Sequence, residues 1–272
     1  MTPPPRLYKY EPFTAQSLQN LKDQVIYFGS PLRFNDPYDR ALSPSIKEPT
    51  DAEIEKIRRH YLANPDLEVK TRLEFERASP SKLRIMFLRI GQKLLDQAIA
   101  EFLSHRGIAC FSEKKNNLLM WSHYGAHCKG FCLEFSSSAD PFQRIKKVSY
   151  TQDMPVFDIV QMMCGDDFDP VLNLYCTKSI DWAYEQEWRV IHNQVGTAYG
   201  YPPEALTGVY LGPDMPFTAF EIIALILAGQ NEHVQLWQGS RSKSSFSVEF
   251  QSVTYKSHLD AKRLGLLGTI GA

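Results

Sequence analysis

Long apolar runs, a disulfide framework and a strong excess of either charge are all missing from this sequence. No apolar stretch approaches the ~20 residues that a membrane-spanning helix needs, and the first residues lack the apolar segment of a secretory signal peptide. The five cysteines have no regular spacing, which is typical of reduced thiols in a cytosolic protein. The net charge of −1 excludes a globally basic surface, so only a local patch is left to attract nucleic acid. We therefore expect a cytoplasmic protein with no membrane partner.

Several motifs that would identify an enzyme class are also absent. The chain has neither of the standard glycine-rich phosphate-binding loops, nor the Gly-x-Ser-x-Gly turn of serine hydrolases. His123 and His127 are four residues apart, with Cys128 and Cys132 nearby, but this spacing matches no standard structural zinc pattern. Cys110 has no local partner that would activate it as a nucleophile. We therefore predict no metal site.

The order of the predicted elements indicates the fold class. A chain of 272 residues with 43% hydrophobic content is large enough for one substantial core. Its strand-like and helix-like segments interleave without the even alternation of a parallel doubly wound sheet. We predict an α+β fold, a single domain over residues 1–272 with a mixed or antiparallel, split β-sheet core. Residues 41–105 are charge-rich and helical in period, which predicts a helical insertion.

Individual elements follow from periodicity, caps and turn residues. Strands are predicted at 7–10, 25–28, 108–112, 130–135, 148–150, 187–192, 209–211, 234–237 and 246–250. Helices are predicted at 14–23, 51–62, 81–103, 118–125 and 217–228, and residues 155–180 are predicted to be mostly helical. Thr14 is the predicted cap of the first of these helices.

The segment from Trp182 to Ile191 concentrates residues that carry chemistry. In a strand, Glu185 and Glu187 would project from the same face, because side chains alternate with a period of two. Two carboxylates among aromatic rings suit a cationic, planar, hydrogen-bonding ligand. The alternative is a solvated structural pair, with Arg189 neutralising one of the glutamates.

Two further segments are candidates for the same site. Trp121, His123 and Tyr124 come from one short stretch and predict a wall of rings whose polar tips need partners. Residues 34–37 read Phe-Asn-Asp-Pro, a combination that is typical of a turn because Asn and Asp side chains bond nearby backbone amides.

These segments together resemble a widespread bacterial family classed as a domain of unknown function. The resemblance runs from about residue 7 to residue 215 and implies relatedness of fold rather than an activity. Its motifs are Leu-Tyr-Lys-Tyr at 7–10, Phe-Asn-Asp-Pro at 34–37, Cys-Phe-Ser-Glu at 110–113, Trp-Ser-His-Tyr at 121–124, Lys-Gly-Phe-Cys-Leu-Glu-Phe at 129–135, Tyr-Glu-Gln-Glu-Trp-Arg at 184–189 and Leu-Gly-Pro at 211–213.

The order of elements is also similar to ADP-ribosyltransferases of the diphtheria-toxin and poly-ADP-ribose-polymerase type, which carry a His-Tyr-Glu triad on a split sheet around NAD. The matching segments are 7–9, 17–21, 26–30 and 187–190. The resemblance implies that Tyr27 stacks on the nicotinamide ring and that Glu187 stabilises the positive charge developing on the ribose. Glu185 would orient the acceptor, and Lys9 stands where the triad has His or Arg.

The resemblance implies an enzyme that cleaves the nicotinamide–ribose bond of NAD and transfers ADP-ribose to an unknown acceptor macromolecule or to water. NAD would be its substrate, and no metal would be required. The implied catalytic residues are Glu187, Glu185 and Tyr27. The implied NAD-binding residues are Lys9, Tyr10, Ser30, Phe34, Asn35, Trp121, His123, Tyr124 and Arg189.

Two other functions stay open at the level of the sequence. One is a non-enzymatic module that binds a ligand or partner, as part of a bacterial defence, toxin or stress system. The other is a metal-dependent enzyme acting on nucleic acid, since acidic clusters hold Mg²⁺ in many such enzymes. Its metal-binding acids would be Asp36, Glu134, Glu185 and Glu187. A local basic face for nucleic acid would come from Arg58, Arg59, Lys70, Arg72 and Arg77.

Overall fold

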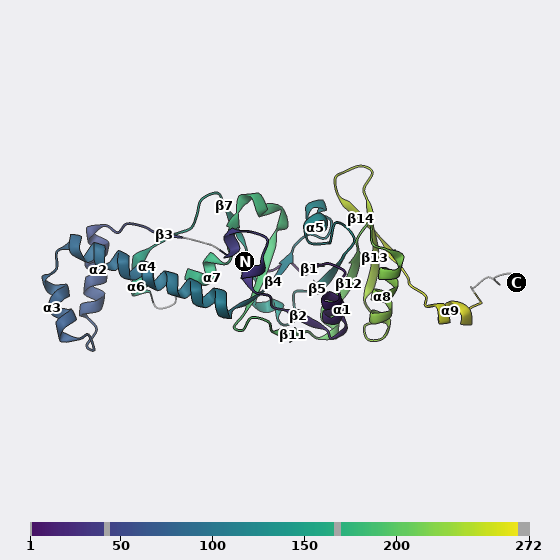
Figure 1. Cartoon of the computed structure of the whole chain (residues 1–272), viewed down its shortest axis with the longest axis horizontal. Coiled ribbons are helices and arrows are strands. Elements are labelled where there is room, and N and C mark those ends of the chain that lie inside the picture. The colour runs from purple at the N-terminus through teal and green to yellow at the C-terminus, as the bar shows by residue number, and fades with distance from the viewer. Residues whose placement is uncertain (1, 41–43, 166–169, 266–272) are drawn as a thin grey trace. The chain divides into compact units, whose positions relative to one another are not determined.

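The computed structural model describes residues 2–40, 44–165 and 170–265, and the chain divides into two compact units (Figure 1). The sheet unit consists of Met1–Gly29, Gly107–Val148 and Asp181–Ala272. The helical unit consists of Ser30–Arg106 and Ser149–Ile180. Strands and helices are both abundant and the main sheet is mixed, which confirms the predicted α+β class. That the units form one domain stays a prediction.

An eight-stranded sheet dominates the sheet unit, in the order β14-β13-β12-β5-β1-β4-β10-β6. Among the described residues of this sheet, only β12 and β13 pair in parallel. The register between β1 and β4 consists of one pair, Tyr8 with Ser112, so the sheet is nearly divided there. The strands are β1 (Arg6–Glu11), β4 (Gly107–Ser112), β5 (Phe131–Ser136), β6 (Lys146–Lys147), β10 (Glu187–His192), β12 (Leu206–Leu211), β13 (Gln235–Arg241) and β14 (Val248–Val253).

Helices and one small sheet complete this unit. Thr14 caps α1 as the sequence predicts, with its hydroxyl accepting a hydrogen bond from Ser17 N. The β2 strand (Val25–Tyr27) pairs with β11 (Ala198–Gly200) in a separate two-stranded sheet. The helices are α1 (Ala15–Lys22), α5 (Leu118–His123), α8 (Phe217–Ala228) and α9 (His258–Arg263), with 3-10 turns η3 (Phe142–Arg144), η4 (Ile180–Glu185) and η5 (Pro203–Ala205).

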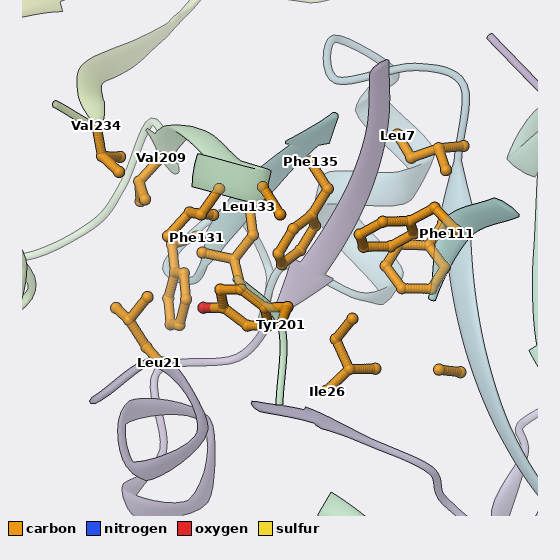
Figure 2. Packing of buried hydrophobic residues seen from close by; sticks show 14 of the residues in the cluster. Leu7, Leu21, Ile26, Phe111, Phe131, Leu133, Phe135, Tyr201, Val209 and Val234 are labelled. Carbon is orange, nitrogen blue, oxygen red and sulfur yellow. The ribbon is translucent and has the colours of Figure 1, made fainter. Parts of the chain in front are cut away.

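The main core lies on one face of the eight-stranded sheet (Figure 2). Phe131, Leu133 and Phe135 alternate along β5 toward this face, and Leu21 of α1 and Ile223 of α8 pack against it. Each buried side chain of this size contributes roughly 1.5–3 kcal/mol relative to an exposed one. The intervening residues of the same strands are left for the opposite face, where α5 lies.

The helical unit has a core of its own around Ile54, Phe75 and Phe87. Its helices α2 (Asp51–Leu62), α3 (Val69–Arg77) and α4 (Pro80–His105) fall within the predicted insertion, of which residues 41–43 lie outside the described chain. Other elements are α6 (Ile159–Cys164), α7 (Pro170–Leu174), η1 (Pro31–Arg33), η2 (Tyr38–Arg40) and the paired strands β3 (Ser45–Ile46) with β8 (Val156–Phe157) and β7 (Ser149–Thr151) with β9 (Thr177–Ser179).

The prediction that residues 155–180 are mostly helical is therefore wrong at both ends. Its beginning and its end form β8 and β9, because each finds a strand partner elsewhere in the helical unit. Only its middle is helical, as α6 and α7, and residues 166–169 lie outside the described chain.

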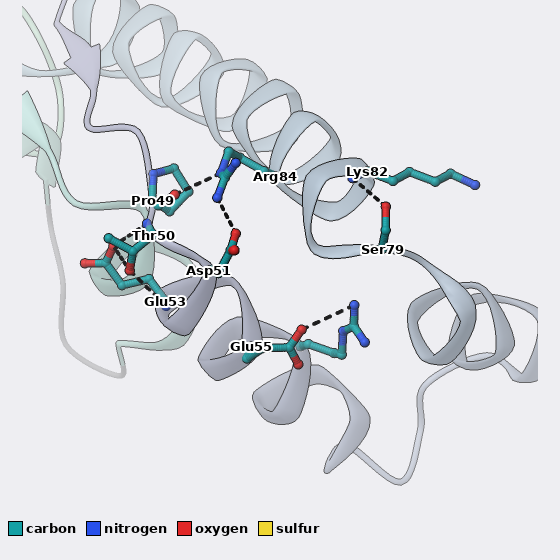
Figure 3. A network of polar contacts seen from close by, with 9 residues as sticks. Pro49, Thr50, Asp51, Glu53, Glu55, Ser79, Lys82 and Arg84 are labelled. Atoms are coloured by element: carbon teal, nitrogen blue, oxygen red, sulfur yellow. Dashed lines mark hydrogen bonds and ion pairs between the residues drawn. The ribbon is translucent and has the colours of Figure 1, made fainter.

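Polar contacts fix the start of α2 (Figure 3). Thr50 and Glu53 form a capping box, in which each side chain bonds the other's backbone amide. Arg84 of α4 donates to the carbonyl of Pro49 and pairs with Asp51.

None of the helices in the described residues combines the length and the apolar character that crossing a membrane requires.

Candidate functional site

The two glutamates at the centre of the predicted site do not share a strand. Glu185 ends the 3-10 turn η4 and Glu187 begins β10. Between them Gln186 has a φ of 45°, a left-handed conformation that turns the chain. Glu185 thus lies outside the strand, so the condition for a shared strand face is not met, although both side chains are buried, with exposed fractions of 2% and 5%.

Glu185 is held by groups of its own chain. The hydroxyl of Tyr124, just after α5, donates to Glu185 Oε1 at 2.5 Å. The hydroxyl of Ser112 donates to the Glu185 carbonyl at 2.6 Å. Carboxylate and backbone are thus both fixed, the first by α5 and the second by β4.

Glu187 forms a buried bidentate ion pair with Arg189, two residues along the same face of β10. Arg189 Nε donates to Oε1 at 2.8 Å, and a terminal guanidinium nitrogen donates to Oε2 at 3.0 Å. Arg189 therefore neutralises one glutamate, as in the alternative of a structural pair. The pair is buried rather than solvated, since Arg189 is fully buried. Burial, with the Glu187 carboxylate nearby, raises the pKa of the neighbouring Cys110 thiol well above its ordinary value, which keeps that thiol neutral.

Four aromatic rings form a continuous row beside these carboxylates, which we call the ring row: Trp182, Tyr184, His123 and Tyr124. Their neighbouring ring centroids are 6.0–6.3 Å apart. His123 Nδ1 and the Tyr184 hydroxyl are joined by a hydrogen bond of 2.9 Å. His123 is exposed and the other three rings are partly buried. Of the predicted wall of rings, His123 and Tyr124 therefore come together.

Asn117 locks α5 to η4. Its side-chain oxygen caps α5 by accepting from Leu119 N and Met120 N, while its amide donates to the Tyr184 carbonyl at 3.1 Å. The ring row therefore rests on two elements that Asn117 joins in addition to the hydrogen bonds from Tyr124 to Glu185 and between His123 and Tyr184.

Trp121 and Tyr10, both predicted to contact NAD, lie in the interior in this structure. Trp121 is fully buried and packs edge-on against Tyr10, with ring centroids 5.1 Å apart. The indole N–H donates to the Lys115 carbonyl and the Tyr10 hydroxyl to the Lys114 carbonyl. Their polar atoms donate to backbone carbonyls of the same chain, because Trp121 lies on the face of α5 that packs against β1.

The three residues carried over from the triad do not meet. Lys9 pairs with Glu11 at 3.1 Å. Its neighbour Tyr8 lies opposite Ser112 of β4, and Ser112 also lies opposite Glu187 of β10, so Tyr8 and Glu187 share one face of the sheet. Lys9 and Glu187 are therefore on opposite faces of the sheet.

Tyr27 lies near the other end of β4. It precedes Gly29, which bridges to Ile108, whereas Glu187 pairs with Ser112. Ile108 and Ser112 are four residues apart along β4, which corresponds to about 13 Å. The Tyr27 side chain is 38% exposed and lies on the β2–β11 sheet.

The remaining predicted residues belong to the helical unit. Ser30 caps η1 through a hydrogen bond from Leu32 N, and Asp36 accepts from Tyr38 N, so the predicted turn chemistry at 34–37 is confirmed. Phe34 and Asn35 lie in this same turn segment.

The acids proposed for a metal site do not gather. Across residues 2–40, 44–165 and 170–265, no group of three or more His, Cys, Asp and Glu side chains is placed to hold an ion. Glu134 instead accepts hydrogen bonds from Thr207 and Tyr210.

A pocket of about 360 Å³ was not predicted, because no motif in the sequence signals it. Its lining is Phe13, Ala126, Lys129, Pro216, Thr218 and Ala219.

Residues 120–190 match the family described as a protein of unknown function, DUF2971. The match begins within α5 and ends within β10, so it includes the ring row and the residues Glu185, Glu187 and Arg189. It supports the predicted link to an uncharacterised family over this part of the chain. No curated protein and no solved structure matches. The resemblance to ADP-ribosyltransferases stays a prediction.

Proposed function

We propose that this chain is a ligand-binding protein whose binding surface is the ring row. The observation that carries the proposal is that four rings are accessible to different degrees while hydrogen bonds fix their positions. These bonds run from Asn117 to the Tyr184 carbonyl, between His123 and Tyr184, and from Tyr124 to Glu185. Rigid, partly exposed rings with polar tips stack planar ligands and orient them through a few hydrogen bonds.

The glutamates act in this proposal as part of the frame. Glu187 is compensated by Arg189 and Glu185 accepts from Tyr124, so neither carboxylate is displayed to a ligand. The polar contacts come instead from the Tyr184 hydroxyl and from His123. Because His123 uses Nδ1 toward Tyr184, its Nε2 is the ring nitrogen that a ligand addresses.

The ligand chemistry that fits is a planar ring with hydrogen-bonding substituents. Electron-rich Trp and Tyr faces favour a cationic ring, and the nicotinamide of NAD is such a ring. NAD is therefore the first ligand to test, with its fragments as separate probes.

Calorimetric titration with NAD, nicotinamide and adenosine tests the proposal. Tyr184→Leu removes one ring and the partner of His123, and we expect its affinity to fall about tenfold or more, because stacking on an aromatic ring is worth ~1–3 kcal/mol. Tyr38→Leu is the matched control, since Tyr38 is an exposed tyrosine of the helical unit. Equal affinities of the two variants, or no binding of any probe to the wild type, would refute the proposal.

A second candidate is cleavage of NAD, in which the chain transfers ADP-ribose to an acceptor or to water. It is favoured by the position of Glu187, which pairs with Ser112 at the junction where β1 and β4 share one residue pair. A carboxylate at a nearly divided sheet resembles the arrangement of the ADP-ribosyltransferases. In this candidate Glu187 separates from Arg189 and stabilises the oxocarbenium ion as nicotinamide leaves.

Mass spectrometry of nicotinamide and of ADP-ribose adducts decides between the candidates. Wild type and Glu187→Gln are incubated with NAD without metal, and circular dichroism checks the fold of the variant, which lacks the negative charge of Glu187 beside Arg189. Nicotinamide release by the wild type alone supports the enzyme. Binding without release supports the ligand-binding protein, and release by both proteins removes Glu187 from any catalytic role.

A further inference from the structure

The ammonium group of Lys115 is held by aromatic rings rather than by an acid. Its Nζ lies 4.5 Å from the ring centre of Tyr210, 5.7 Å from that of Tyr8 and 5.9 Å from that of Trp237. It donates one hydrogen bond, of 2.9 Å, to the Tyr210 hydroxyl. Within the described chain no carboxylate lies at ion-pair distance from it.

The three rings form a floor and a wall built on strands. Tyr210 and Trp237 face each other in register on β12 and β13, and their rings are parallel within 8° at 5.8 Å. Tyr8 of β1 stands edge-on to Tyr210 at 74° and 6.0 Å. We call Tyr8, Tyr210 and Trp237 the aromatic cage. None of them belongs to the ring row, so this site is separate from the one proposed above.

A negative charge lies behind the cage. Glu134 of β5 accepts from the hydroxyls of Tyr210 at 2.7 Å and Thr207 at 2.8 Å, and it pairs with Arg6 at 3.5 Å. Burial by itself would raise the pKa of Glu134, but the hydrogen bonds together with the nearby charge of Lys115 outweigh burial and hold this pKa below its ordinary value. The carboxylate is therefore ionised at neutral pH, and its field favours a cation in the cage.

The backbone around Lys115 is anchored without help from its ammonium group. The Lys115 carbonyl accepts from Trp121 Nε1 at 2.7 Å, and the Lys114 carbonyl accepts from the Tyr10 hydroxyl at 2.8 Å. The Asn116 carbonyl accepts from Val248 N at 3.1 Å. The lysine side chain can therefore leave the cage by rotating its own bonds while the loop stays in place.

We propose that the aromatic cage is a binding site for a ligand that carries a quaternary ammonium group, and that Lys115 is its internal occupant in this structure. A primary ammonium has three N–H donors and is strongly hydrated, and among the described residues only one of these donors is matched. A quaternary ammonium has no donor to satisfy and is attracted by ring faces, as in aromatic cages generally. Such a ligand replaces Lys115 without leaving an N–H unpaired.

Calorimetric titration of the full chain with tetramethylammonium tests the proposal. Lys115→Ala empties the cage and should bind the probe roughly tenfold more tightly than the wild type. Lys114→Ala is the matched control, because Lys114 is the exposed neighbour and contacts none of the three rings. Adding Trp237→Leu to Lys115→Ala should abolish the gain, and circular dichroism verifies that each variant is folded.

Choline and its neutral isostere, with carbon in place of nitrogen, separate charge recognition from hydrophobic binding. Binding of choline alone supports the proposal, whereas equal binding of both molecules overturns it. A titration with trimethyllysine distinguishes a modified peptide from a choline-type headgroup as the source of the group. No binding of any ammonium probe to folded Lys115→Ala overturns the proposal, as does equal affinity of Lys115→Ala and Lys114→Ala.

Discussion

Tyr124 and Glu185 form the contact through which α5 holds the buried carboxylate. The tyrosine hydroxyl donates to an acid that is 2% exposed. A buried carboxylate that loses a donor keeps its full desolvation penalty, so this hydroxyl contributes directly to the contact between η4 and the end of α5. The sequence showed that both residues carry polar groups, but not that they meet, since 61 residues separate them.

Tyr124→Phe should lower the free energy of unfolding by about 1–3 kcal/mol, because it deletes one donor to a buried acceptor. Urea unfolding followed by tryptophan fluorescence measures the change. Tyr27→Phe is the control, since the Tyr27 side chain is 38% exposed, and it should stay within about 0.5 kcal/mol of the wild type. Equal stabilities of the two variants would mean that the Tyr124 hydroxyl does not support Glu185.

Glu134 gives stability a defined pH dependence. Its folded-state pKa lies below the ordinary value of 4.5, so the folded protein binds its proton less readily than the unfolded chain does. The contribution is fully present above pH 4.5 and is lost as pH falls through the folded-state pKa. The stability difference between wild type and Glu134→Gln should therefore shrink from pH 7 toward about pH 3, as measured by urea unfolding. The exposed Glu249→Gln serves as control, and a difference that grows on acidification would contradict the assignment.

At the scale of elements, the loop between α5 and β5 fits the sheet through backbone contacts. Three successive residues, Ala126, His127 and Cys128, have φ values of 48°, 53° and 68°, a run that costs energy in L-residues. The loop then presents Gly130, whose amide bonds the Gly125 carbonyl and whose own carbonyl accepts from Gly212 N. Room for these close approaches exists only because Gly130 and Gly212 carry no side chain.

Gly130→Ala should destabilise the sheet unit by at least about 2 kcal/mol, because overpacking against a fixed backbone forces main-chain shifts. Its Cβ would lie 2.3 Å from the Glu11 carbonyl oxygen. Gly200→Ala is the matched control, since no atom lies within 4 Å of its Cβ position. Thermal unfolding of the two variants compares them, and similar melting temperatures would show that the loop can move away from β1.

For the whole molecule, the two compact units differ in how their cores are built. The sheet unit buries Phe131, Leu133 and Phe135 from one strand, while the helical unit buries Phe75 and Phe87 between helices. Separate cores are the physical basis of separately unfolding regions.

Phe87→Ala should cost about 3–5 kcal/mol and act mainly within the helical unit, because it leaves a cavity in that core. Hydrogen exchange followed by mass spectrometry should show faster exchange in α2 and α4, with β5 and β12 unchanged. Phe135→Ala should give the reverse pattern, since its side chain belongs to the core of the sheet unit. Loss of protection in both units from either variant would mean that the whole chain unfolds cooperatively.

The local elements follow from the sequence alone. Helices 51–62 and 217–228 and the strand 187–192 have the predicted bounds, and Thr14 caps α1 as expected. Periodicity, caps and turn residues act over a few neighbouring positions, so the information for these elements is contained in each segment.

Which segments meet became known from the three-dimensional fold. The left-handed conformation of Gln186 leaves Glu185 in the turn η4 and Glu187 in the strand β10. Strand alternation places Lys9 on the face opposite Glu187. The aromatic cage joins residues of β1, β12 and β13 to a lysine before α5, and no spacing in the sequence signals it. Strand order and register are fixed by contacts between distant segments, which is why the partners of Glu185, Glu187 and Lys115 became known only from the fold.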